Sequence, residues 1–198
     1  MLTNLSKYSI ILASNSPRRK ELLTGLGLDF KVKTLKDIDE TYPDGLLGED
    51  IPKHIAKKKA QAYAQNMDDN ELIITADTIV YLTNINGKGE VLGKPCDEDE
   101  AKQMLRKLAG KTHEVITGVS IMTKQKCVVF AVTSKVTFDI LSQEDIDYYV
   151  SKYKPMDKAG AYGIQEWIGF VGVNALVGSY FNVMGLPVQR LYKELQKF

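Results

Sequence analysis

A long apolar run at residues 72–82 contains a single charged side chain, that of Asp77. The length of the run and its β-branched residues predict a buried, central β-strand. Burying an isolated carboxylate costs several kcal/mol, so Asp77 must pair with a cation, bind a metal ion or lie at an open strand end that faces a cleft. The sequence therefore predicts a sheet protein with a polar site on its central strand.

The segments around this strand alternate between strand-like and helix-like patterns. Strands are predicted at residues 8–13, 29–35, 115–122 and 128–141, and helices at residues 17–27, 51–65, 97–108, from 142 onward and 187–197. Residues 83–93 are predicted to form a hairpin or loop, and the glycine-rich residues 154–178 to be irregular. The expected fold is α/β with some antiparallel pairing. Because repeats and linkers are absent, we expect a single domain over residues 1–198.

Composition limits the classes of protein to which this chain can belong. Hydrophobic residues make up 44% and charged residues 26%, which is typical of a folded domain and not of a disordered chain. The 26 basic residues against 25 acidic ones leave a net charge of +1, which offers no general field for nucleic acid or an anionic membrane. The apolar residues 10–13 are too few for a signal peptide or a membrane span, so we expect a cytoplasmic protein.

The cysteines and histidines argue against several kinds of metal or disulfide site. Cys96 and Cys127 lack the spacing of a zinc ribbon or a disulfide scaffold, and we expect both to be reduced, packed thiols. His54 and His113 cannot form a histidine-rich metal site, and His113 is interpreted as structural. Any metal ion would therefore have to be held by carboxylates, which favours a hard cation such as Mg²⁺.

The segment Ser14-Asn-Ser-Pro-Arg-Arg19 is the first candidate site. A serine-rich loop between a strand and a helix presents backbone N–H groups, hydroxyls and the positive helix end to an anion, and Arg18 and Arg19 add charge. Two arginines in a first helical turn oppose the helix dipole unless an anion compensates them, which favours an anion site. The alternative is that Ser16 only caps the helix and both arginines are solvated.

Lys59 is the second candidate, because it lies on the apolar face of its predicted helix. Ile55, Ala56, Ala62 and Tyr63 occupy the positions three and four residues away from it. A cation that points inward needs an anionic partner. The alternative is a lysine whose stem covers the core while its ammonium reaches water.

Three further residues give weaker signals. Glu40 belongs to an acidic loop of a kind that is usually solvated, and Lys94 follows the flexible hairpin. Gln165 ends a loop, residues 157–165, whose glycines allow a close backbone approach and whose amide both donates and accepts hydrogen bonds. Such a loop can wrap a planar base or form an ordinary turn.

Taken in order, these motifs resemble the Maf family of nucleoside-triphosphate pyrophosphatases over nearly the whole chain. The matching segments are residues 12–19 with 21–23, Asp37-Ile-Asp-Glu40, residues 56–60, Ala76-Asp-Thr-Ile-Val80, Gly93-Lys-Pro95, residues 113–119, residues 157–160, Tyr162-Gly-Ile-Gln165 and residues 178–187. None of these segments is decisive alone, but their order is specific.

The resemblance implies an elongated mixed β-sheet with flanking helices and two lobes around a nucleotide cleft, similar to inosine-triphosphate pyrophosphatases and usually a homodimer. It implies cleavage of a nucleotide into a monophosphate and pyrophosphate with a divalent cation, and it is compatible with the clearing of non-standard nucleotides. Asp77 matches the family's proton acceptor, and Arg18, Thr78 and Gln165 match positions linked to base specificity. The Tyr-Gly-Ile-Gln form resembles the dTTP/UTP branch.

The residues themselves are compatible with this chemistry. A triphosphate carries about four negative charges, which Arg18, Arg19, Lys59 and Lys94 would neutralise, with the hydroxyls of Ser14 and Ser16 beside them. Glu40 and Asp77 would hold Mg²⁺ or Mn²⁺, or Asp77 would deprotonate the attacking water.

The chain departs from the family pattern at two positions, and other functions remain open. Thr75 stands where a glycine is common before the Ala-Asp pair, and Glu166 where a glycine usually follows the glutamine.

Two alternative functions are a nucleotide-binding regulator of cell division without essential catalysis and a 7-methyl-GTP pyrophosphatase. The retained Asp77, Glu40 and Lys59 favour an enzyme, and the charge balance disfavours an RNA-binding module.

Overall fold

The structure is a computed structural model that describes residues 2–36, 38–83 and 89–198. Within these residues one mixed sheet has the strand order β2 (Lys31–Val32), β1 (Ser9–Leu12), β3 (Glu71–Thr83), β5 (Thr112–Met122), β6 (Cys127–Phe138) and β7 (Val173–Val177), with β4 (Gly89–Leu92) paired to β3. β1 pairs in parallel with β2 and β3, whereas β4 is antiparallel to β3 and β7 is antiparallel to β6. The expected mixed α/β fold, with the apolar run as an inner strand, is confirmed.

The chain divides into two compact units. The first unit comprises Met1–Asp77, Thr117–Val132 and Gly185–Phe198, and the second comprises Thr78–Ile116 and Thr133–Met184. β3, β5 and β6 each contribute residues to both units. The single domain expected over residues 1–198 stays a prediction.

Among the described residues, none of the helices has the length and apolar character needed to cross a membrane.

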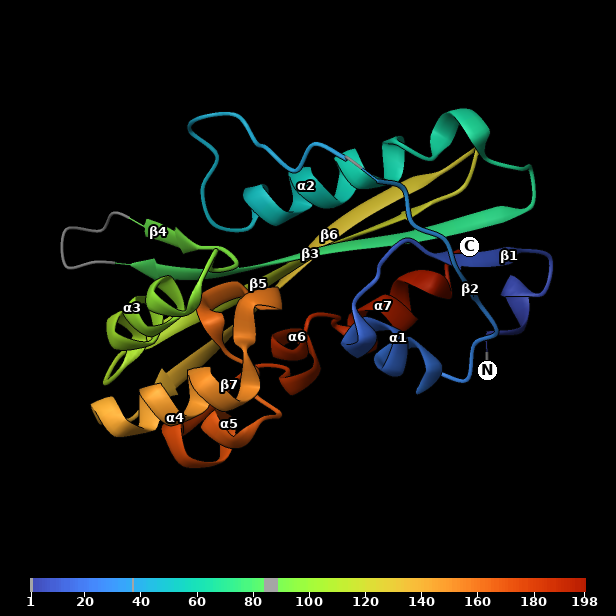
Figure 1. Cartoon of the computed structure of the whole chain (residues 1–198). Coiled ribbons are helices and arrows are strands. Elements are labelled where there is room, and N and C mark those ends of the chain that lie inside the picture. The colour runs from blue at the N-terminus through green and yellow to red at the C-terminus, as the bar shows by residue number, and fades with distance from the viewer. Residues whose placement is uncertain (1, 37, 84–88) are drawn as a thin grey trace. The chain divides into compact units, whose positions relative to one another are not determined.

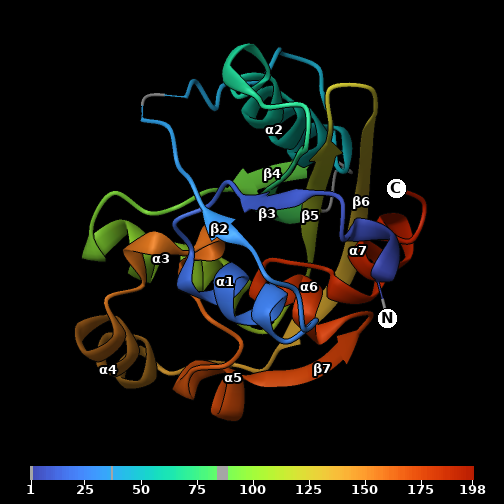
Figure 2. The ribbon, with the colours of Figure 1, turned by 90° about the vertical axis from the view of Figure 1, so that its right-hand side faces the viewer.

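Three helices cover the part of the sheet that belongs to the first unit. α2 (Asp50–Gln61) lies on one face, and α1 (Pro17–Thr24) and α7 (Val188–Leu195) lie on the other (Figures 1 and 2). The core under α2 is a cluster of buried apolar side chains: Ile11, Ala60, Tyr63, Met67, Ile73 and Met122. The apolar face of α2 therefore packs against the sheet, and this is the face that the helical periodicity predicts.

Gly118 on β5 sets how closely α2 approaches the sheet. A Cβ atom at this position would lie 2.3 Å from the carbonyl of Pro52, in the first turn of α2. Only a residue without a side chain allows this contact, because a Cβ atom would collide with backbone and not with a flexible side chain.

The second unit contains α3 (Glu98–Leu108), α4 (Gln143–Tyr153), α5 (Trp167–Gly172) and α6 (Tyr180–Met184). The side chain of Asp97 accepts a hydrogen bond from the Glu100 N–H and caps α3, as the acidic start of this helix predicts. Ser142 and Asp145 form a capping box at the start of α4. Both helix starts are therefore confirmed.

The prediction of an irregular segment at residues 154–178 is wrong in part, because the segment contains α5 and β7. The strand β7 forms only by pairing with distant residues of β6, where Lys135 lies opposite Val177. The two glycines of α5 weaken its helix signal, yet Gly169 is needed there because a Cβ atom would lie 1.8 Å from the carbonyl oxygen of Ile164.

The cysteines also differ from expectation, since Cys96 and Cys127 are free but exposed.

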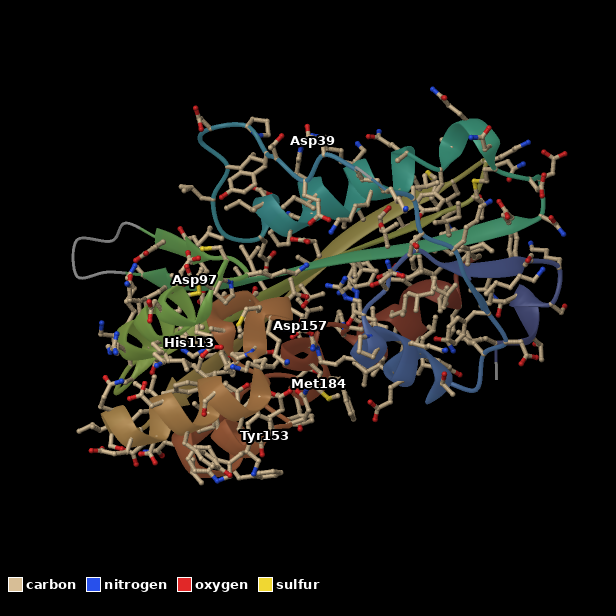
Figure 3. All side chains as sticks on the ribbon, in the orientation of Figure 1. Asp39, Asp97, His113, Tyr153, Asp157 and Met184 are labelled. Carbon is tan, nitrogen blue, oxygen red and sulfur yellow. The ribbon has the colours of Figure 1, made fainter. Side chains whose placement is uncertain are left out.

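His113 is a structural residue of the second unit, as the sequence indicates. It is 1% exposed (His113 is labelled in Figure 3), its Nε2 lies 2.7 Å from the Tyr162 hydroxyl, and its ring packs edge to face against those of Phe138 and Tyr162. Burial lowers the pKa of His113 to about 4. The ring is therefore neutral in the folded protein at pH 7.

We expect His113 to make the protein less stable in mild acid. The unfolded chain binds a proton near pH 6.5, whereas the folded chain binds it only near pH 4, so the free energy of unfolding falls between these values. This group alone should remove about 2 to 3 kcal/mol between pH 7 and pH 4.5. Urea unfolding at both pH values measures this change. The free energy of unfolding of His113→Phe should fall less between the two pH values than that of the control His54→Gln. Equal losses in the two variants would contradict the assignment.

Candidate active site

Lys59 lies on the last turn of α2 between two carboxylates of the same unit. Its ammonium nitrogen is 2.9 Å from Asp77 Oδ1 and 3.0 Å from Glu40 Oε2. The Lys59 and Asp77 side chains are each 13% exposed, whereas that of Glu40 is 52% exposed. The inward-pointing lysine thus has an anionic partner, and Asp77 has the cation that its burial requires.

Thr75 explains the first departure from the family pattern. Its side chain is buried in β3, and its hydroxyl donates a 2.6 Å hydrogen bond to the carbonyl of Ala56, one turn before Lys59. Thr75 therefore ties β3 to α2 two residues before Asp77. This bond links the strand that carries Asp77 to the helix that carries Lys59.

The serine-rich loop after β1 forms the helix start that the sequence predicts. Ser16 is the N-cap of α1, and its Oγ accepts from the Arg19 N–H at 3.4 Å, with Pro17 as the first helical residue. Ser14 Oγ accepts from the Ser16 N–H at 3.2 Å. Both hydroxyls thus shape the loop, and their contact with a phosphate stays a prediction.

Arg19 points from α1 towards the backbone beside Asp77. Its Nε donates to the Gly185 carbonyl and one Nη donates to the Ala76 carbonyl, both at 2.8 Å. Burial lowers the pKa of Arg19, and the nearby charge of Asp77 opposes this shift. The sequence indicates a cation here but gives no sign of this bridge, which supports the residue before Asp77. Arg18 lies in the same helical turn, partly buried, and its role towards phosphate stays a prediction.

The other three candidates belong to the second unit. Thr78 follows Asp77 on β3 and is partly buried, and Lys94 is exposed just after β4. Gln165 is partly buried, and its Oε1 is buried with no hydrogen-bond partner within the described residues. An orphaned buried acceptor is costly, so Gln165 offers a place for a ligand N–H donor.

Sequence reasoning missed Tyr149 and Lys158, which both contact Glu166, the residue that follows Gln165. The Lys158 ammonium is 3.1 Å from Glu166 Oε1, and the Tyr149 hydroxyl donates to Glu166 Oε2. Both side chains are buried. A lysine in a matching family segment was the available signal, but its partner could not be read from spacing.

The donor set of the first unit fits a hard divalent cation. Glu40 and Asp77 converge on one point, at present the Lys59 ammonium, and both offer carboxylate oxygens. The described residues contain no group of three or more histidine, cysteine or acidic side chains that could hold a metal ion. Two carboxylates suffice for Mg²⁺, which keeps several waters and takes further oxygens from substrate phosphates. Asp37 of the same acidic motif lies outside the described residues.

Comparison with solved structures supports the fold. The chain is similar to the structure of the Staphylococcus aureus Ham1 protein, with a TM-score of 0.54 and 18% identity over 94% of this chain and 99% of that chain. This similarity confirms the mixed α/β fold that the resemblance to inosine-triphosphate pyrophosphatases implies.

The chain belongs to the Maf family, because the family model described as Maf-like protein matches residues 9–198. It is 64% identical to a dTTP/UTP pyrophosphatase of Phocaeicola vulgatus and 59% identical to one of Bacteroides fragilis. Both matches cover 100% of this chain and 100% of the relative.

Proposed function

We propose that this protein hydrolyses nucleoside triphosphates to the monophosphate and pyrophosphate, with dTTP and UTP as preferred substrates. The observation that carries the proposal is the 64% identity over the full chain to a relative named dTTP/UTP pyrophosphatase. The Lys59, Asp77 and Glu40 cluster supports it, since it combines a cation with carboxylates at one place. A role in clearing non-standard nucleotides is compatible with this activity.

The cationic residues bind and neutralise the phosphates in this proposal. Phosphoryl transfer depends on positioning and on charge stabilisation more than on covalent work by the protein. Lys59 is fixed by its packed helix and by two carboxylates, so its ammonium position is set before substrate arrives. Arg18, Arg19 and Lys94 are the further cations of the proposal.

Asp77 acts on the attacking water, directly or through a metal ion. Its Oδ1 is bound by Lys59, and a carboxylate held in this way can orient a water molecule and accept its proton. Glu40 and Asp77 would hold Mg²⁺ or Mn²⁺, and the bound cation would supply charge stabilisation on the phosphates.

Gln165 reads the base in this proposal. Uracil and thymine present an N3–H donor between two carbonyl acceptors, which match the unpartnered Gln165 Oε1 and the amide donor of the same side chain. Cytosine presents an acceptor at N3, so it would leave buried groups unpaired at about 1–3 kcal/mol each.

Pyrophosphate release over a nucleotide panel tests the function. We expect dTTP and UTP to be cleaved well, and CTP, ATP, GTP and 7-methyl-GTP poorly. Gln165→Ala should erode the preference for dTTP and UTP over CTP more than it slows turnover of CTP, as measured by kcat/KM for each nucleotide. A wild-type enzyme that favours CTP or 7-methyl-GTP would overturn the assignment of the base.

The same assay tests the metal ion. Activity should vanish in EDTA and return with Mg²⁺ or Mn²⁺, because the cation that Glu40 and Asp77 would hold is the group that stabilises the charge on the reacting phosphates. Full turnover in the chelator would rule out the metal-binding part of the proposal.

Two further properties belong to the proposal, a cytoplasmic location and a homodimeric state. A mass near 44 kDa, about twice that of the 22.1 kDa chain, is expected by light scattering, and a monomer mass would contradict the dimer. The regulator without catalysis would bind nucleotide but release no pyrophosphate, so the panel assay separates it from the enzyme.

A further inference from the structure

The second unit contains a charged network around the buried Lys158 that has no part in the proposed phosphate chemistry. Lys158 is 7% exposed, and its ammonium pairs with Asp157 Oδ1 at 2.7 Å and with Glu166 Oε1 at 3.1 Å (Asp157 is labelled in Figure 3). The second oxygen of Glu166 accepts from the Tyr149 hydroxyl. Both carboxylate oxygens of Glu166 are therefore engaged, which helps to offset the desolvation cost of placing these charges in the protein.

The same tyrosine also holds the turn that carries Gln165. The Tyr149 hydroxyl accepts a 3.0 Å hydrogen bond from the Gly163 N–H, and the Glu166 N–H donates to the Gly163 carbonyl at 2.9 Å. Gln165 thus lies within a four-residue turn, between two residues that are fixed through one hydroxyl. Burial raises the pKa of Tyr149 far above neutrality, and the Glu166 carboxylate adds to the shift, so this hydroxyl keeps its proton.

The side chains of Gln165 and Glu166 both lie close to the Cα atom of Gly163, which carries no side chain. A Cβ atom there would lie 2.9 Å from the Glu166 carboxyl carbon and 3.1 Å from Gln165 Nε2. The Glu166 carboxylate cannot give way without breaking its bonds to Lys158 and Tyr149. Both groups therefore lie beside the same Cα atom, and Gln165 Oε1 is buried without a hydrogen-bond partner in the described part of the chain.

We propose that Glu166, held by Lys158 and Tyr149, is a positioning residue that keeps the Gln165 amide aimed at the substrate base. This inference rests on the proposed function for the identity of the base. It gives the second departure from the family pattern a role, because a glycine at this position would have no carboxylate to anchor the turn. Lys158 acts through Glu166 and needs no contact with substrate.

Glu166→Gln, Lys158→Met and the double variant test the proposal by substrate discrimination. The ratio of kcat/KM for dTTP to that for CTP should fall about tenfold or more in each single variant, mainly through a higher KM for dTTP. The double variant should match the single variants, since both act on one network. Lys107→Met is the control, because it breaks an exposed pair with Glu90 in the same unit and should leave the ratio unchanged. A loss of thermal stability with an unchanged ratio would reduce Glu166 to a structural residue and overturn the proposal.

A nuclear magnetic resonance measurement tests the positioning without any catalysis. The side-chain amide signals of Gln165, assigned by their loss in Gln165→Ala, should be dispersed in the wild type and should move towards free glutamine values in Glu166→Gln. Unchanged Gln165 signals in that variant would overturn the proposal. If the wild type cleaves neither dTTP nor UTP, the proposed function fails, and this measurement still decides whether Glu166 positions Gln165.

Discussion

Asp77→Asn is expected to lower kcat for pyrophosphate release from dTTP by about 10²- to 10⁴-fold, the range that one general base contributes. The amide is nearly isosteric with the carboxylate and can still accept from Lys59, so the protein should stay folded. It can neither take a proton from water nor bind a hard cation well. A steady-state pyrophosphate assay measures the loss, and circular dichroism checks the fold.

Asp69→Asn is the matched control, because Asp69 forms an ion pair with Lys124 in the same unit but is 88% exposed. It should keep wild-type activity. Near wild-type release by folded Asp77→Asn would remove Asp77 from the mechanism. Recovery of Asp77→Asn at high Mn²⁺ would assign Asp77 as a metal ligand, whereas a loss that no Mn²⁺ concentration restores would assign it as the base.

Lys59→Met is expected to weaken triphosphate binding by about 10- to 100-fold, the value of a charge-assisted hydrogen bond to phosphate. Methionine has a similar length and suits the apolar face of α2, so the helix should remain packed. The loss leaves Asp77 without its cation, and Lys59→Met combined with Asp77→Asn should recover stability but not binding. Calorimetry with a non-hydrolysable dTTP analogue measures the dissociation constant.

Lys57→Met on the same helix is the control for this experiment. Lys57 is exposed, so its loss should leave nucleotide affinity unchanged. If Lys59→Met binds the analogue as tightly as Lys57→Met does, Lys59 has a structural role only, as the partner of Asp77 and Glu40.

The helix starts could be predicted because their determinants lie within a few residues. Ser16 caps α1, and the reciprocal contacts of Ser142 and Asp145 cap α4, all within one helical turn of chain. The strand β7 could not be predicted, because it depends on pairing with β6 and its own sequence gives a weak strand signal.

The candidate site could likewise be predicted only in part from the sequence. Periodicity places Lys59 on the inner face of α2, and the apolar run marks Asp77 as a charge in need of a partner. Neither pattern says that the two residues, 18 apart in the chain, meet at 2.9 Å with Glu40 beside them. That contact depends on how α2 packs against β3.

The sequence by itself determined the α/β class, most element positions and the need for partners of the buried charges, because these follow from interactions within one or two turns of chain and from the cost of burying charge. Only the tertiary structure decided which partners those charges have: Asp77 and Glu40 for Lys59, backbone carbonyls for Arg19, and Glu166 for Lys158. The physical reason is that an ion pair forms between groups that packing brings within about 3 Å, and the packing of distant segments leaves no local pattern to read.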